Sequence, residues 1–213
     1  MRLCILLLLA APLLAEPRSV ARIRLEGAEL LLQMVTVDAI AVGKLHENGA
    51  ASLADVQAAE RRRLDAVLDW LDAAHAAGEE VPDAAKRRRD TLEKIEQLEA
   101  RRYAAAQKLA AAGKLDAESL LERRVAHQLS WIERNHADQV ANAKGETPKL
   151  RAERERQRAK VELLAAKERL ERRTKLQEAG QATAMSVRAA ERAVVRAETA
   201  LAIAKERLRL AEQ

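Results

Sequence analysis

Aromatic side chains are nearly missing from this 213-residue chain, which has no Phe, one Tyr and two Trp. A compact globular core usually relies on the large apolar area of aromatic residues. Ala, Leu, Arg and Glu dominate instead, a composition that is typical of long helices and coiled coils. No stretch alternates apolar and polar residues as a half-buried strand does. We therefore predict an all-α protein that buries Leu, Val and Ala along seams between long helices.

Cysteine occurs once, as Cys4, inside an apolar run from Leu3 to Ala15 that follows a basic residue and precedes a charged one. This pattern is typical of a secretory signal peptide. We predict a signal peptide over residues 1–15 and export to the periplasm or the outer membrane. A buried first helix of a cytosolic protein is the alternative. The run is short for a membrane span, so we expect no span in the mature chain, which would also lack any thiol, disulfide or Cys-based metal site.

Neither sign of charge dominates the chain: 38 Lys and Arg residues stand against 33 Asp and Glu residues, a net charge of +5. Basic clusters such as 61–63 and 86–89 are interleaved with acidic residues and lack the aromatic residues on which bases stack. We interpret them as solvated helix faces and expect no nucleic-acid partner. The cluster at 86–89 opposes the helix dipole at the start of its helix, and a partner surface there is the alternative.

Glycine is also scarce, with seven residues, and three of them mark a repeated turn. The turn reads Lys-Leu-x-x-x-Gly-x-x-(Ser/Asp/Thr), and its glycines are Gly49, Gly113 and Gly180. Glycine readily takes the left-handed conformation that ends a helix. The Ser, Asp or Thr three residues later can cap the next helix. The chain is therefore predicted to form the same helical hairpin tip three times.

A second kind of break alternates with these tips and pairs a glycine with a proline, Gly78 with Pro82 and Gly145 with Pro148. We predict that each glycine ends one helix and that each proline opens the next, where its missing N–H is harmless. His75 and His136 precede these breaks at matching positions. Because cations are favoured near a helix C-terminus, we interpret both as turn-stabilising residues rather than metal ligands.

Together the breaks predict six helices, over 18–47, 52–77, 82–111, 116–143, 148–178 and 183–213. Short connections make consecutive helices antiparallel, so the three Gly tips should lie at one end and the two Gly–Pro turns at the other. We predict three helical-hairpin repeats, 16–81, 82–147 and 148–213. The last helix shows the clearest heptad seam, formed by Val187, Ala190, Val194, Ala197, Leu201, Ala204, Leu208 and Ala211.

Residues suited to catalysis are few. The chain has no Gly-rich phosphate loop and no His-x-x-x-His pair, and catalysis needs a nucleophile, an acid–base pair or a metal held rigidly together. His127 lies one helical turn from Trp131, and we interpret the two as packing partners. We predict that the protein is not an enzyme and has no metal and no cofactor.

The tips carry a longer pattern, Leu-x-x-x-Gly-x-x-(Ser/Thr)-x-x-x-Val-x-x-Ala-Glu. Its residues in the first and third copies are Leu45, Gly49, Ser52, Val56, Ala59 and Glu60, and Leu176, Gly180, Thr183, Val187, Ala190 and Glu191. This pattern resembles the periplasmic helical hairpins of TolC-type outer-membrane efflux proteins and of the membrane-fusion adaptors that dock onto them. The chain lacks the β domains that both of those families carry.

The resemblance implies that the tips contact other helical hairpins. Adaptor tips carry an Arg, a Leu four residues later and a Ser seven residues after that, a spacing that Arg172, Leu176 and Thr183 reproduce. The candidate interaction residues are Arg172, Leu176, Thr183, Leu45, Ser52, Leu109 and Asp116. We expect a non-enzymatic envelope component of a TolC-like efflux or secretion assembly, with channel or adaptor hairpins as partners and homo-oligomers as a further option. A free-standing periplasmic coiled-coil scaffold or spacer is the alternative.

Overall fold

The computed structural model describes residues 19–213, so the predicted signal peptide and Cys4 lie outside the described residues. Residues 19–213 contain α-helices and no β-strand, which confirms the predicted all-α fold. The helices are α1 (Val20–Glu47), α2 (Leu53–Ala76), α3 (Ala84–Ala111), α4 (Ala117–Asn142), α5 (Pro148–Glu178) and α6 (Ala184–Ala211). Within this range no helix combines the length and the hydrophobicity that crossing a bilayer requires.

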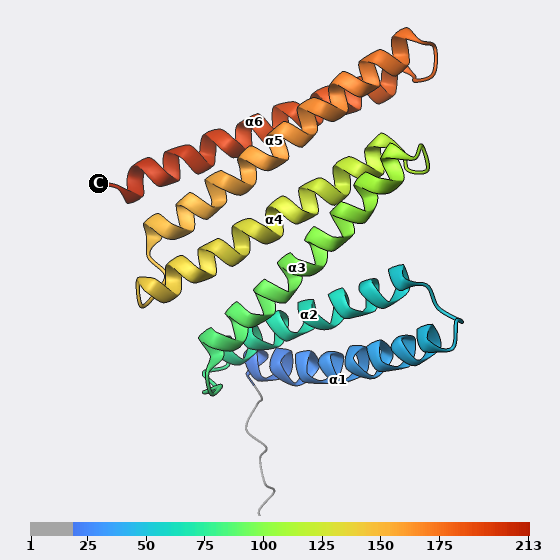
Figure 1. The fold of residues 1–213 in the computed structure, drawn as a ribbon. Helices are drawn as coiled ribbons and strands as arrows, with labels where there is room; N and C mark the ends of the chain where they lie inside the picture. The colour runs from blue at the N-terminus through green and yellow to red at the C-terminus, as the bar shows by residue number, and fades with distance from the viewer. Residues whose placement is uncertain (1–18) are drawn as a thin grey trace, which may run out of the picture.

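The helices run alternately up and down as three antiparallel hairpins, α1–α2, α3–α4 and α5–α6 (Figure 1). The three Gly tips lie at one side of the molecule, on the right in Figure 1, and the two other turns lie at the opposite side. Across residues 19–213, helix backbones approach one another only between helices adjacent in sequence, and most extensively within each hairpin. The hairpins therefore form an open row, and no other helix of the described part of the chain lies against the outer faces of α1 and α6.

The heptad seams explain how each hairpin closes. Every predicted seam residue of α6, from Val187 to Ala211, is buried or half-buried. The heptad seam of α1 is likewise buried or half-buried, and α1 packs on α2; its residues are Leu25, Ala28, Leu32, Val35, Ala39 and Val42. On α3, heptad spacing predicts a seam of Thr91, Ile95, Leu98, Arg102, Ala105 and Leu109. The first four are buried or half-buried, but Ala105 and Leu109 are exposed near the tip, so the prediction is wrong there.

A small cluster of large side chains joins the first two hairpins. Leu64 of α2 and Ile95 and Leu98 of α3 are buried together. Beside this cluster, Glu99 is 2% exposed. Its Oε1 accepts hydrogen bonds from Nη1 of Arg61 at 3.1 Å and from Nη1 of Arg102 at 3.0 Å. These two guanidinium groups supply the opposite charge that a buried carboxylate requires.

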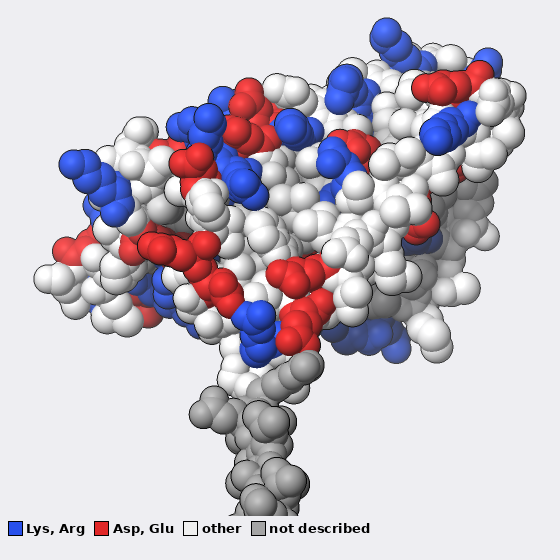
Figure 2. Space-filling model, turned by 90° about the horizontal axis from the view of Figure 1, so that it is seen from below, with Lys and Arg blue, Asp and Glu red and all other residues white. Residues whose placement is uncertain are grey.

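Several ion pairs cross the junction between the second and third hairpins. Nε of Arg169 on α5 lies 2.6 Å from Oε1 of Glu118 on α4, and Arg158 Nη1 lies 2.9 Å from Glu133 Oε1. Such partly exposed pairs contribute little each to stability. Figure 2 shows, on the underside of the molecule, that acidic and basic side chains are intermixed rather than gathered into a patch of one sign.

Candidate functional site

All five reversals between residues 19 and 213 use the same helix C-cap. In each, a backbone N–H reaches back to the carbonyl five residues earlier, the bond that defines the Schellman motif. The donor and acceptor pairs are Ala50 to Leu45, Glu79 to Ala74, Lys114 to Leu109, Gly145 to Val140 and Gln181 to Leu176, with N···O distances of 2.7–3.0 Å. The predicted tips at Gly49, Gly113 and Gly180 therefore share one backbone geometry, with φ of 67–72° at the glycine.

The two Gly–Pro breaks differ in a way that the sequence did not predict. Gly78 has a φ of 73° and ends α2 as expected, but at the second break Lys144, with a φ of 56°, takes that position. Gly145 is the following residue, so its assignment as the helix-ending residue was wrong. An L-residue with a side chain is disfavoured in this region, and the Lys144 backbone is therefore strained.

The two prolines also differ. Pro148 is the first residue of α5, as predicted, and Thr147 caps the helix by accepting the N–H of Leu150. Pro82 does not open a helix, because α3 begins at Ala84. Asp83 precedes that helix with a φ of 55° and makes no side-chain cap. The missing cap leaves the first turn of α3 less well satisfied than the first turns of its neighbours.

Side-chain caps restart the helix after each Gly tip. Ser52 Oγ, Asp116 Oδ1 and Thr183 Oγ1 accept the backbone N–H three residues later, at 3.2, 2.8 and 3.2 Å. In the first tip the Ser52 hydroxyl, and then its backbone N–H, hold the pKa of Asp55 below its ordinary value. In the second, the hydroxyl and the backbone N–H of Ser119 lower the pKa of Asp116. The predicted residues Ser52, Asp116 and Thr183 thus act as caps.

One leucine is exposed at the same place in every tip. Leu45, Leu109 and Leu176 lie four residues before the tip glycines and are 49%, 45% and 37% exposed. Their carbonyls accept the Schellman bonds, so a rigid turn holds each side chain at the edge of the molecule. Since the three tips lie on one side (Figure 1), these leucines are the predicted site residues that the fold brings to a common edge.

Sequence reasoning missed two further exposed apolar residues, one just after the first tip and one just after the third. Leu53 is the first residue of α2 and Met185 the second of α6, and both side chains are exposed. An apolar residue just after an N-cap was the available signal, because that turn is ordinarily polar.

Arg172 is held differently from the other predicted site residues. Its guanidinium donates to the carbonyl of Ala117 at the start of α4 and to the carboxylate of Glu168. Its contacts therefore link α5 to α4 within the chain, whereas the tip leucines project from it.

The histidines have structural contacts. His136 is buried, and its Nε2 lies 3.0 Å from Oε1 of Glu146 in the following turn, as expected of a turn-stabilising residue. The matching His75 side chain is exposed and makes no hydrogen bond within residues 19–213. The ring of His127 stacks on Tyr103 with centroids 5.8 Å apart, which corrects the predicted pairing with Trp131.

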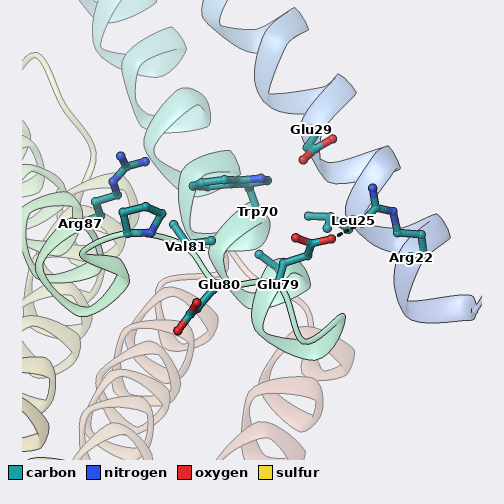
Figure 3. A pocket seen from close by; sticks show the side chains of 10 residues that line it. Arg22, Leu25, Glu29, Trp70, Glu79, Glu80, Val81 and Arg87 are labelled. Carbon is teal, nitrogen blue, oxygen red and sulfur yellow. Dashed lines mark hydrogen bonds and ion pairs between the residues drawn. The ribbon is translucent and has the colours of Figure 1, made fainter.

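A hollow of about 350 Å³ opens between α1, α2 and the α2–α3 turn (Figure 3). Trp70 and Val81 lie together on one side of it, and the carboxylate of Glu80 points away from the Trp70 ring. Glu79 is paired with Arg22 of α1. The lining includes no histidine and no hydroxyl or thiol nucleophile, so we assign the hollow no chemistry.

Comparisons of the chain with protein-family models, curated proteins and solved structures give no match. Between Ser19 and Gln213, no three His, Cys, Asp or Glu side chains are grouped as a metal site would require. The most distinctive candidate site is therefore the edge formed by the three tips.

Proposed function

We propose that the protein is a non-enzymatic cell-envelope component that binds helical hairpins of other proteins through its three tips. The observation that carries this proposal is the exposure of Leu45, Leu109 and Leu176 at one position of three equivalent turns. The resemblance of the tips to efflux-type hairpins suggests channel or adaptor hairpins of an efflux or secretion assembly as the partners.

Rigid presentation supports this use of the leucines. Each lies in a hydrogen-bonded turn, so ordering it against a partner loses little conformational entropy. Apolar side chains at regular spacing suit the knobs-into-holes contacts that helices make with one another. Arg172 has a smaller part in the proposal, because its donors already serve Ala117 and Glu168.

A free-standing scaffold is the second candidate function. Its supporting observation is that the two outermost helices expose apolar side chains along their outer faces, for example Val195, Ile203 and Leu210 on α6. Such faces suit lateral association of whole hairpins rather than contact at the tips.

Site-specific photo-crosslinking in cells distinguishes the two functions. A photoreactive amino acid replaces Leu45, Leu109 or Leu176 in turn. Val195 serves as the control, because it is exposed on the outer face of α6 and is not part of a tip. We expect the tip positions to crosslink to hairpin residues of an envelope channel or adaptor, identified by mass spectrometry, and Val195 not to do so. Crosslinks only between copies of this chain, or equal products from Val195, would contradict binding through the tips.

A further inference from the structure

The outer face of α1 is apolar along its length, and within residues 19–213 no helix packs against it. We define the α1 outer face by six exposed residues at heptad spacing, Ile23, Gly27, Leu30, Met34, Val37 and Ala41. The opposite side of the same helix, from Leu25 to Val42, packs on α2. Helix α1 therefore carries two seams, and the hairpin fills only one of them.

The exposed area on this face is large for a monomer. Four large residues of the α1 outer face and the adjacent Leu31 and Ile40 are each 46–65% exposed. Together they present on the order of 600 Å² of apolar surface, the upper end of the largest patch on a typical monomer. A standard interface buries about 800 Å² per partner, so this face with its margins is of the size that a dimer needs. Figure 2 views the side on which α1 lies in Figure 1 and shows broad uncharged areas between the charges.

We propose that the α1 outer face binds the same face of a second copy of this chain, with the two α1 helices antiparallel about a two-fold axis. This proposal is independent of the tips and of their partners. Side-chain sizes support the orientation. When the axis passes beside Leu31, the large residues Ile23 and Val37 face the small residues Ala41 and Gly27 of the second copy. Leu30 then faces Met34, so large and small residues alternate as tight packing requires.

Charges at the margin support the same orientation. Arg24 and Asp38 follow Ile23 and Val37 on one margin of the face, and both are exposed and form no ion pair within residues 19–213. In an antiparallel pair, this margin of one α1 helix lies against the same margin of the second α1 helix. Arg24 then lies opposite Asp38 of the second copy, twice per dimer. A parallel pair would oppose Gly27 to Gly27 and would leave both charges without a partner.

A lipid surface fits the face less well. Helices that lie on membranes carry many Lys and Arg residues beside their apolar face. Between Val20 and Gly43, α1 has two arginines and three acidic residues, which gives no attraction to anionic lipid. The charge pattern thus favours a second copy over a membrane.

The first test is the mass of the full chain in solution by analytical ultracentrifugation. We expect the wild type to have twice the 23.6 kDa mass of one chain and Leu30→Glu/Met34→Glu to have the mass of one chain. Both residues are exposed, so the variant should keep its helicity in circular dichroism. The matched control, Val195→Glu/Ile203→Glu on the exposed face of α6, should stay dimeric.

Charge reversal tests the orientation. Arg24→Asp or Asp38→Arg alone brings like charges together and should raise the dimer dissociation constant by about tenfold at low salt. The double variant Arg24→Asp/Asp38→Arg restores opposite pairs and should restore dimerisation. Absence of rescue by the double variant would overturn the antiparallel arrangement. A monomeric wild type would overturn the proposed dimer. This holds whether the monomer is free in solution, binds anionic vesicles through α1, or has its α1 outer face covered by residues 1–18.

Discussion

Individual residues with positive φ set where this chain reverses. Four of the five Schellman turns place a glycine in the left-handed position, and the fifth places Lys144 there. A Cβ added at Gly113 would meet no atom within 4 Å, so space does not explain the choice of glycine. The cost of a side chain at these positions is therefore a backbone cost.

Exchanging residue types at two equivalent positions should change stability in opposite directions. Gly113→Ala should lower the free energy of unfolding by about 1 kcal/mol, because alanine is disfavoured at positive φ. Lys144→Gly should raise it by ~0.5–1 kcal/mol, since it relieves the same strain. Urea denaturation followed by circular dichroism measures both changes.

Gly43→Ala is the matched control for these turn variants. Gly43 lies inside α1, has no positive φ and has open space around it. The same glycine-to-alanine change should stabilise the protein there by about 1 kcal/mol through helix propensity. Equal effects at positions 43 and 113 would show that φ is not the cause.

A carboxylate takes part in the helix cap at two of the three tips, Asp55 as the capping-box partner of Ser52 and Asp116 as the cap itself. Asp55 and Asp116 accept hydrogen bonds from Ser52 and Ser119, which lower the pKa of each carboxyl group below its ordinary value of 3.8. A carboxyl group whose pKa is lower in the folded state stabilises that state when it is ionised. The stabilisation is complete above the unfolded pKa and is lost as pH falls through the folded pKa.

Acid should therefore weaken these two tips while sparing the third, which is capped by Thr183. We expect the melting temperature of the protein to decrease once the pH is lower than about 4. The melting temperature of the Asp116→Asn variant should decrease less steeply with falling pH, because Asn caps a helix about as well as Asp and does not titrate. Thermal melting between pH 7 and pH 2.5 measures the effect, and identical pH profiles for the variant and the wild type would contradict this account of Asp116.

At the scale of the whole molecule, the open row resembles a short repeat array. Among the six described helices, each packs only against its neighbours in sequence, and packing between hairpins is less extensive than packing within a hairpin. Stability in such an array is close to a sum of local terms. One end of the molecule should therefore unfold without the other.

Val194→Asp should reveal this local unfolding. Val194 is buried between α5 and α6, and an unpaired buried charge is strongly destabilising. We expect amide hydrogens of α5 and α6 to exchange at least about tenfold faster, while those of α1 and α2 keep their rates. Hydrogen exchange with mass spectrometry measures both regions.

The neighbouring substitution Val195→Asp is the control, because Val195 lies on the exposed face of the same helix. This substitution should leave the amide hydrogen exchange rates of all six helices nearly unchanged. Equal acceleration in α1 and α6 after Val194→Asp would mean that the molecule unfolds as one cooperative unit.

Local sequence signals were sufficient for the helices and for most turns. The predicted helix ends agree with the structure to within two residues, because glycine, the cap residues and heptad spacing act within a few residues of one another. The same reasoning failed at Lys144 and Pro82. At these two turns, the helix boundary lies beside the residue that the turn places at positive φ. The presence of a glycine or proline nearby does not determine which residue that is.

Contacts between helices decided the remaining features. The stack of His127 on Tyr103 and the link from Arg172 to Ala117 join residues of different helices. Their positions depend on how neighbouring helices are rotated and offset. The open row is likewise a tertiary result, since heptad seams pair adjacent helices equally well in a closed bundle. Only the three-dimensional arrangement leaves the second seam of α1 without a partner helix from residues 19–213, because neither later hairpin folds back onto it.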